Sequence, residues 1–255
     1  MKNIWIICRK ELRSYFVSPV AYLLLTAFSA VFGLFFWLGL RQLLLFAIES
    51  QMRGQSFPMN INEFLVRPLL SNLNVIGLFF IPFITMRLFA EEKRTGTIEL
   101  LATSPVRDVE VIVGKWLAAV GLYAFMLLLI SLNFIFLFIY GKPDWKPMAL
   151  GFLGLLLQAA GLLAVGSFIS TLTRNQIIAA AATIAVCLVL WVIEWVSSFE
   201  ATTSARVLAY TSVVTHFEPF AKGVFNTKDV IFYISLIFLG LFLTTRAMES
   251  LRWRS

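Results

Sequence analysis

Residues 116–139 read WLAAVGLYAFMLLLISLNFIFLFI, a run of 24 residues without a charged side chain. A helix needs about 20 mostly apolar residues to cross a hydrocarbon core of about 30 Å, because each residue adds about 1.5 Å. In lipid, every backbone N–H must also find its acceptor inside the segment. The run therefore predicts a transmembrane helix.

Five more apolar runs flank this one along the 255-residue chain. Hydrophobic residues make up 60% of the sequence and charged residues only 14%, so the chain is far more apolar than a soluble domain. The composition and the runs predict an all-α membrane protein with six transmembrane helices, forming a single domain over residues 1–255. The other five predicted spans cover residues 20–40, 69–86, 148–173, 177–193 and 230–245.

The distribution of Lys and Arg between the loops predicts the orientation. One side of the predicted membrane carries thirteen of them: Lys2, Arg9, Lys10, Arg13, Arg87, Lys93, Arg94, Arg107, Lys115, Arg174, Arg246, Arg252 and Arg254. The other side carries eight: Arg41, Arg53, Arg67, Lys142, Lys146, Arg206, Lys222 and Lys228. The positive-inside rule then places both termini in the cytoplasm of a multi-pass protein. The net charge of +7 needs no nucleic-acid partner to explain it.

The first nineteen residues, MKNIWIICRKELRSYFVSP, are too polar for a cleavable signal. At helical spacing, apolar and charged side chains fall on different sides, which predicts an amphipathic helix lying in the membrane interface. Ile4, Cys8, Leu12 and Tyr15 share one side, and Lys2, Arg9 and Arg13 share another. Two uses are compatible with this helix: a topogenic anchor, and an elbow helix that a partner subunit also touches.

The stretch RLFAEEKRTGTIELLATSPVRDVEVIVGK, residues 87–115, concentrates charge between the second and third spans. Gly96 permits a sharp turn, after which residues 97–103 have room for about two helical turns. Ser104 and Pro105 end this piece and are predicted to begin the next helix, as N-cap and first helical residue. An isolated helix this short must pack against something. It is either a solvated connector on its own membrane domain or a docking element for a soluble partner.

Within this stretch, AEEKRTGTIELLATSPVRDVEVIVGK (90–115) resembles the segment E-E-x-x-x-G-T-x-E-x-L-x-x-x-P of ABC transporter permeases of the type-two exporter class. The chain is similar to that class along essentially its whole length. The shared features are six predicted spans, cytoplasmic termini, an amphipathic N-terminal helix and a long segment before the last span. TSVVTHFEPFAKGVFNTKDVIFYISL (211–236) further resembles the gliding-motility-associated permease subfamily.

The resemblance implies the permease subunit of an ATP-driven exporter in a bacterial inner membrane. Residues 92–104 are then a coupling helix that docks a separate cytoplasmic ATPase. A second permease copy or a sister permease completes the membrane part, and the subfamily suggests an accessory membrane protein with a large extracytoplasmic domain. The implied ATPase contacts are Glu91, Glu92, Arg94, Gly96, Thr97, Ile98, Glu99, Leu101, Ser104 and Pro105.

The sequence holds no G-x-x-x-x-G-K-[ST] phosphate loop, because Gly114-Lys115 lacks both the preceding glycine and the following hydroxyl. We therefore expect no catalytic residue and no cofactor on this chain, with ATP and Mg²⁺ bound by the partner ATPase. Cys8, Cys187 and the single histidine, His216, are too few for a metal site and are interpreted as packing residues.

Two regions are candidates for the dimer contact, the pathway and an outer gate. The alanine run of the fifth span permits close helix approach, either inside the bundle or between subunits; by resemblance the span lies near the dimer axis. Glu194 is flanked by two tryptophans, which suggests the interface. By resemblance, residues 199–229 form re-entrant outer helices. The candidates are Ala179, Ala180, Ala181, Ala182 and Glu194 for the dimer or pathway, and His216, Phe217, Glu218 and Gly223 for the gate.

Other functional classes predict different features. A secondary transporter without ATPase coupling would be expected to show inverted repeats, broken helices and buried ion-coupling groups. A membrane-embedded enzyme would need acids, bases or metal ligands converging inside the spans. The spans instead offer scattered Asn, Gln, Ser and Thr, and neither alternative explains the capped charged stretch. Lipid, polysaccharide, peptide and drug substrates all remain open.

Overall fold

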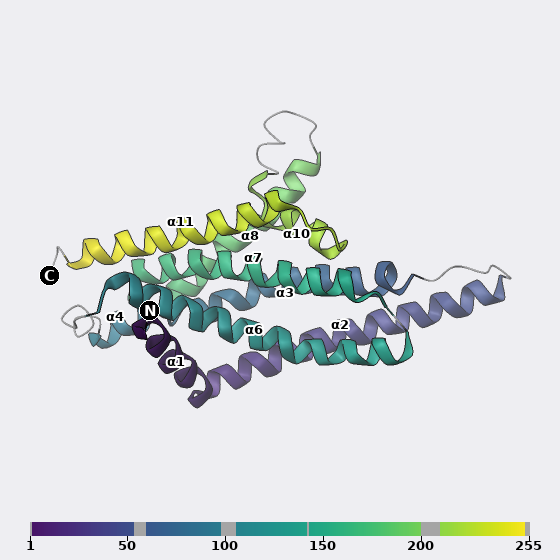
Figure 1. Ribbon diagram of the computed structural model, residues 1–255, viewed down its shortest axis with the longest axis horizontal. Coiled ribbons are helices and arrows are strands. Elements are labelled where there is room, and N and C mark those ends of the chain that lie inside the picture. The colour runs from purple at the N-terminus through teal and green to yellow at the C-terminus, as the bar shows by residue number, and fades with distance from the viewer. Residues whose placement is uncertain (1, 54–59, 98–105, 142, 200–209, 253–255) are drawn as a thin grey trace.

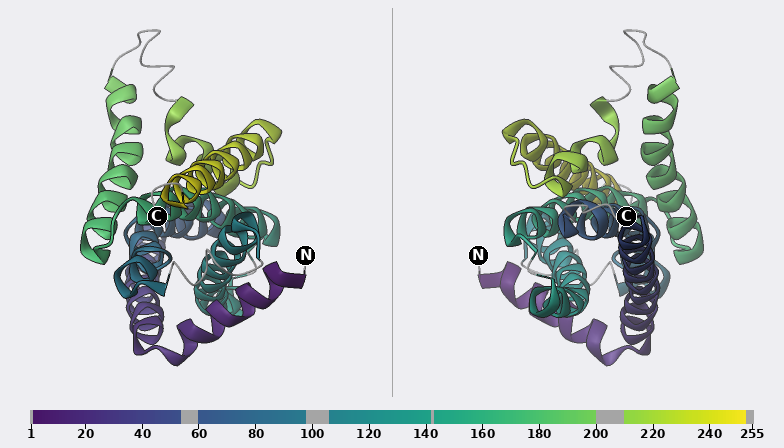
Figure 2. Two further views of the ribbon diagram at one scale, coloured as in Figure 1. Left: turned by 90° about the vertical axis from the view of Figure 1, so that its left-hand side faces the viewer. Right: turned by 90° about the vertical axis from the view of Figure 1, so that its right-hand side faces the viewer.

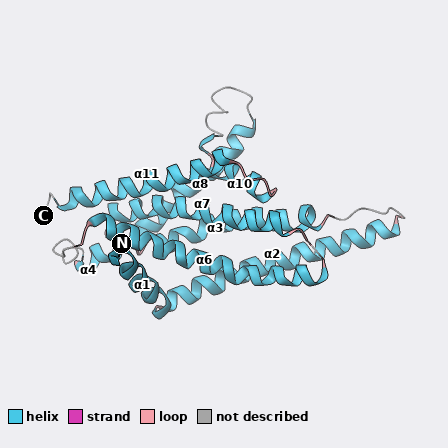
Figure 3. Cartoon of the chain, in the orientation of Figure 1, coloured by secondary structure: helices cyan, strands magenta, loops and turns pink. Residues whose placement is uncertain are grey.

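The computed structural model describes residues 2–53, 60–97, 106–141, 143–199 and 210–252. The described chain is helical and contains no strand in these ranges (Figure 3). Its elements are α1 (Lys2–Val17), α2 (Pro19–Met52), the π-helix η1 (Asn62–Val66), α3 (Arg67–Thr85), α4 (Ala90–Thr95), α6 (Asp108–Tyr140), α7 (Trp145–Leu172), α8 (Gln176–Phe199), α10 (Val213–Ala221) and α11 (Thr227–Arg252).

Within the described ranges, six helical stretches are long and apolar enough to cross a membrane, which confirms the predicted fold class. Most extend beyond the predicted apolar runs. The first, α2, continues past residue 40 to Met52, because Arg41 and Gln42 lie on its exposed surface and do not interrupt the helix. The fifth and sixth, α8 and α11, likewise extend past both ends of the short runs that predicted them.

The N-terminus, α4 and the C-terminal end of α11 lie at the same end of the bundle (Figure 1). The C-terminal end of α2, the helix η1, the C-terminal end of α6 and the start of α7 lie at the opposite end, as Figure 1 also shows. This arrangement fits an even number of crossings. We call the two ends the α4 end and the η1 end.

Helix α7 lies between other helices and packs along α11 through small residues. A Cβ atom on Gly240 would lie 2.8 Å from the Cβ of Ala164, and one on Gly161 would lie 2.9 Å from Leu236. The small residues of the fourth predicted span therefore serve packing within the chain. Around this pair of helices, the end-on views of Figure 2 show α8 and α2 at different sides of the bundle.

Helix α1 crosses α6 and presents its apolar side to it, as the sequence pattern predicted. Cys8 is buried, whereas Trp5 and Ile6 face outward. The close approach depends on Gly114 of α6, where a Cβ atom would lie 2.9 Å from Ile7 and 3.1 Å from the carbonyl oxygen of Ile4. The outward apolar side chains are suited to a membrane interface.

The start of α6 differs from the prediction. The helix begins at Asp108 with Arg107 as its extended N-cap residue, and not at Pro105 after a Ser104 cap. The carboxylate of Glu110 accepts a hydrogen bond from the Arg107 N–H at 3.3 Å, which fixes the first turn there. Asp108 lies in the first turn as expected, where the helix dipole favours an acid.

Candidate functional site

The candidate site is at the α4 end and begins with α4 itself. This helix carries Glu91 and Glu92 in its first turn and Lys93 and Arg94 in its last, the order that the helix dipole favours. It ends at Gly96, whose φ of 73° is left-handed and suits glycine. The predicted sharp turn at Gly96 is confirmed.

Lys115 joins α4 to the two helices that cross beside it. Its ammonium group lies 2.8 Å from Glu92 Oε1 and 3.3 Å from Glu11 Oε1, and also 5.6 Å from the centre of the Phe89 ring. The lysine side chain is only 4% exposed and both acids are 17% exposed. Because all three charges are largely shielded from water, removing one of them leaves the others poorly compensated.

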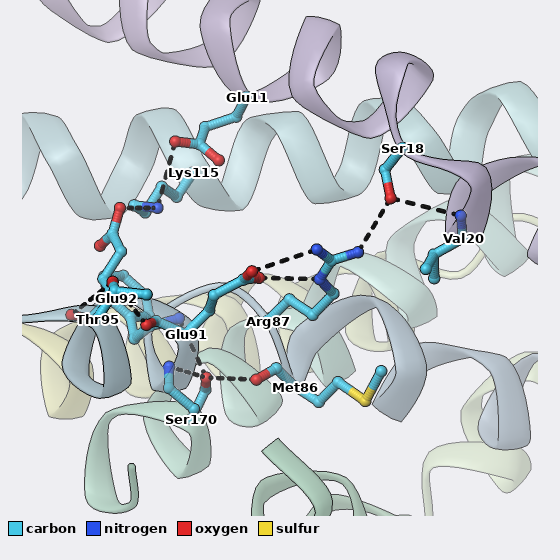
Figure 4. A network of polar contacts seen from close by, with 12 residues as sticks. Glu11, Ser18, Val20, Met86, Arg87, Glu91, Glu92, Thr95, Lys115 and Ser170 are labelled. Carbon is cyan, nitrogen blue, oxygen red and sulfur yellow. Dashed lines mark hydrogen bonds and ion pairs between the residues drawn. The ribbon is translucent and has the colours of Figure 1, made fainter. Parts of the chain in front are cut away.

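A second ion pair connects α4 to the start of the first span (Figure 4). Arg87 donates to both carboxylate oxygens of Glu91, at 2.9 and 3.3 Å, and also to the hydroxyl of Ser18 at 3.2 Å. The Ser18 hydroxyl in turn accepts from the Val20 N–H at 3.4 Å and caps α2. Burial, and then the charge of Glu11, raise the pKa of the nearby Tyr15 phenol, so that it stays protonated.

The third attachment is to the end of α7. The Ser170 hydroxyl accepts hydrogen bonds from the N–H groups of Phe89 and Ala90, at 3.2 and 3.1 Å, so it satisfies donors at the start of α4. Lys93 donates to the carbonyl oxygen of Thr171. Helix α4 is therefore connected through polar side chains to α1, α2, α6 and α7, and its position is coupled to the ends of three spans.

The predicted ATPase-contact residues divide into three groups. Glu91 and Glu92 turn inward and are occupied by the ion pairs just described (Figure 4). Arg94, Gly96 and Thr97 are exposed at the tip of the described chain. The remaining predicted contacts, Ile98, Glu99, Leu101, Ser104 and Pro105, lie outside the described residues.

The outer-gate candidates belong to α10 and the turn after it. His216 lies within 2.7 Å of Asp229 Oδ1 through Nδ1 and within 2.9 Å of the Tyr210 carbonyl oxygen through Nε2. Its ring stacks on Phe232 at 3.9 Å. Both His216 and Asp229 are buried, so the histidine fastens α10 to α11 and is more than an apolar packing residue. Phe217 is buried beside it.

Glu218 and Gly223 occupy the more exposed side of the same region. Glu218 lies 2.7 Å from Lys222 and 3.2 Å from Arg67 of α3, and these partners lower the pKa of its carboxyl group. Gly223 has a φ of 77°, and a Cβ atom there would lie 3.0 Å from Pro147, so the turn requires glycine for both reasons. In the described part of the chain, no group of His, Cys, Asp and Glu forms a metal site.

The fifth-span candidates lie on α8. Ala179 and Ala180 are buried in the bundle, whereas Ala181 is exposed and Ala182 is half-buried. The alanine run thus serves internal packing on one side and leaves a small-residue surface on the other. Glu194 lies in α8, but its side chain is outside the described part.

The six apolar helices of the described chain, with a charged connector fastened to several of them, define a multi-pass membrane protein. The family model of ABC-2 family transporter proteins matches residues 5–209. The chain therefore belongs to the ABC-2 family, and as such is the membrane permease subunit of an ABC transporter. A comparison with curated proteins found no match.

Sequence reasoning missed the central residue of the site. In the sequence, Lys115 is predicted as one of the basic residues on one side of the membrane, and Gly114-Lys115 as an incomplete phosphate loop. In the structure, Gly114 seats α1 and Lys115 joins Glu11 to Glu92. A signal was present: Lys115 stands directly before the long apolar run, where an unpaired charge is costly and a partner is expected. The identity of the two partners depends on the crossing of α1 over α6, which the sequence does not specify.

Proposed function

We propose that this permease couples ATP hydrolysis on a separate cytoplasmic subunit to export, or to mechanical action on an extracytoplasmic partner, through α4 and the segment that follows it. In this proposal residues 92–104 act as the coupling helix. The exposed tip, Arg94, Gly96 and Thr97, contacts the ATPase, while Glu91 and Glu92 transmit its movement inward.

The observation that carries this proposal is the position of Lys115 between Glu11 and Glu92. A solvated connector would need no buried cation to attach it to two other helices. Buried charged groups are expensive to desolvate and are used where a specific arrangement must be kept. A push on α4 would reach α1 and α6 through Lys115, α2 through Arg87 and Ser18, and α7 through Ser170.

The proposal includes the orientation and the location. The α4 end, with both termini, faces the cytoplasm of a bacterial cell, as the excess of Lys and Arg favours. ATP and Mg²⁺ then bind to the partner ATPase. The short apolar helix α10 and the η1 end face the opposite side, where residues 199–229 act as an outer gate with re-entrant helices.

The partners beyond the ATPase rest on the sequence resemblance. We infer a second permease copy or a sister permease in the membrane, with the exposed side of α8 as a candidate contact. Membership of the gliding-motility-associated subfamily, and with it an accessory membrane protein, is proposed from residues 211–236. A secondary transporter is the less favoured function, because the ABC-2 family match accounts for the chain without ion-coupling groups.

Two measurements test the coupling. The purified chain alone is expected to hydrolyse no ATP above background, and addition of the ATPase that copurifies with it should give turnover. The combined variant Glu11→Gln, Glu92→Gln, Lys115→Met replaces the charged triad without leaving a buried charge unpaired. It should still bind the ATPase, but its stimulation of hydrolysis should fall.

A matched control is the variant Glu49→Gln, which changes an exposed acid near the η1 end and should leave stimulation unchanged. Hydrolysis by the rigorously purified chain would contradict the division of labour between subunits. Unchanged stimulation by the triple variant would contradict the role of the buried triad in coupling.

A further inference from the structure

A cavity of about 510 Å³ lies at the η1 end, between α2 and the start of α3. Its volume is within the range of pockets that hold small molecules. It is distant from the α4 network, because α4 and η1 are at opposite ends of the bundle (Figure 1). Nothing in the coupling mechanism uses this cavity.

Three local features shape the cavity. The π-helix η1 widens the turn that leads into α3, and such turns are frequent at functional sites. At Gly39 helix α2 lies close to η1, since a Cβ atom on Gly39 would lie 2.7 Å from Leu65 Cδ1. Farther along α2, Phe46 stacks on Phe64 with ring centres 5.5 Å apart. These contacts fix η1 against α2, and residues of both helices form walls of the cavity.

The lining has an apolar part and a polar part. Phe35, Leu38 and Leu69 are among the apolar residues, and they belong to segments long enough to cross the membrane. The polar part comprises Gln42, Glu63 and Asn72. The apolar run of α2 ends just before Arg41, next to Trp37, as expected at the boundary between hydrocarbon and head groups. The cavity thus lies at the boundary of the hydrocarbon core. There the tail of a membrane amphiphile meets the apolar lining and its head group meets the polar lining.

Glu63 is the charged residue of the lining, and it forms no ion pair with any described residue. The basic residues nearest to it along the chain have other partners: Arg67 pairs with Glu218 at 3.2 Å, and Arg53 pairs with Glu49 at 2.5 Å. A carboxylate in this setting favours a cation and disfavours an anion. The carboxamides of Gln42 and Asn72 can accept hydrogen bonds from the same group.

We propose that this cavity is a binding site for a membrane-borne amphiphile whose head group carries a positively charged ammonium. The apolar tail lies against Phe35, Leu38 and Leu69, and the ammonium lies beside the Glu63 carboxylate. The site does not rest on the proposed coupling to an ATPase, since the cavity and its charge are complete in this chain.

The test uses the full chain in phosphatidylcholine nanodiscs, with two photoreactive probes. One is a long-chain alkylammonium with a diazirine in its tail, and the other is the sulfonate of the same chain. The ammonium probe is expected to label peptides covering residues 35–42 and 63–72 about tenfold more than the sulfonate. The sulfonate cannot make the charge-assisted contact with Glu63, and the loss of one such contact corresponds to about this factor.

The variant Glu63→Gln should remove this preference, and Glu49→Gln, an exposed acid later in α2, should keep it. Glu63 is exposed, so folding is not expected to depend on it. Equal labelling by both probes, a preference that survives in Glu63→Gln, or no labelling because a second copy covers the groove would each overturn the proposal. None of these outcomes involves ATP hydrolysis, so they leave the proposed function to its own test.

Discussion

The α4 end and the region near the η1 end each contain a group of largely buried polar side chains, but the two groups join residues that lie at different distances along the chain. At the α4 end, Lys115 pairs with Glu11, 104 positions away in sequence, and with Glu92 of α4. Near the η1 end, His216 pairs with Asp229, only 13 positions away. The first group joins helices that are far apart in sequence, and the second joins α10 to α11, which follows it directly.

This difference assigns different consequences to the two groups. A change at Lys115 is felt by α1, α4 and α6 together, so it should alter both stability and communication along the permease. A change at His216 should loosen α10 from α11 and leave the α4 end as it was. The predictions below separate these effects, in order of decreasing size.

The largest effect is expected for Lys115→Met. It leaves two largely buried carboxylates facing each other without their cation, and the free energy of unfolding should fall by about 3 kcal/mol or more. Unfolding in mixed micelles of detergent and SDS measures this loss. Adding Glu11→Gln and Glu92→Gln should restore most of the stability. If the single variant is as stable as the parent, the triad is solvated and does not hold the helices together.

His216→Ala should cost less, about 2 kcal/mol, because it removes a buried hydrogen-bond partner of Asp229 and the stacking on Phe232. The same unfolding titration measures it. The double variant His216→Ala, Asp229→Asn should recover part of the loss, since no buried carboxylate is then left without a partner. Stimulation of the ATPase should persist in both, and its loss would show that the two ends are not separable.

Gly96→Ala is expected to destabilise by about 1 kcal/mol, because the left-handed conformation at a φ of 73° disfavours a Cβ atom. Among the described residues, apart from the two chain neighbours of Gly96, no heavy atom lies within 4 Å of the position of that Cβ atom, so the cost is conformational and not steric. Gly96→Asn should cost less than Gly96→Ala, since Asn tolerates this conformation better. If the parent, Gly96→Ala and Gly96→Asn are equally stable, residue 96 does not require the left-handed conformation.

The smallest effect concerns Glu218, an exposed residue whose pKa is lowered from its ordinary value of 4.5 by Lys222 first and also by Arg67. Since the pKa of the Glu218 carboxyl group is lowered in the folded state, its ion pairs stabilise the fold at pH values above the unfolded-state pKa. This stabilisation is lost as the pH falls through the folded-state pKa. The exposed pair should contribute only a few tenths of a kcal/mol. Comparing the parent and Glu218→Gln at neutral and acidic pH measures it, and a gap that widens in acid would contradict this sign.

Much of the fold was predictable because the bilayer imposes its own length and hydrophobicity. The uncharged run 116–139 alone predicts a span, and the amphipathic pattern around Cys8 predicts the buried side of α1. The turn at Gly96 was also predictable, since glycine suits its conformation. The predicted start of α6 was wrong by a few residues. The hydrogen bond from the Arg107 N–H to the Glu110 carboxylate fixes the first turn and outweighs the signal of Ser104 and Pro105.

The candidate site was only partly predictable. The sequence predicts Glu91 and Glu92 as ATPase contacts within a charged stretch, whereas the inward ion pairs that the structure shows for them depend on tertiary packing. Lys115 meets Glu11 only because α1 crosses α6 at Gly114. In the same way, the pairing of His216 with Asp229 depends on the turn at Gly223, which brings α10 back onto α11.

The central claim is that the exposed tip of α4 contacts an ATPase in the cytoplasm. Single cysteines at Thr97 and at Asp144 test it directly, in a background of Cys8→Ser and Cys187→Ala. Both native cysteines are buried, and burial raises the pKa of the Cys8 thiol, so the replacements remove slow-reacting groups. Asp144 caps α7 at the opposite end and serves as the control.

The measurement is maleimide labelling from each side of the membrane, with and without the proposed ATPase partner. We predict that positions 97 and 144 label from opposite sides, and that the ATPase protects position 97 and leaves position 144 reactive. Labelling of both positions from the same side, or full reactivity of position 97 in the presence of bound ATPase, would contradict the account.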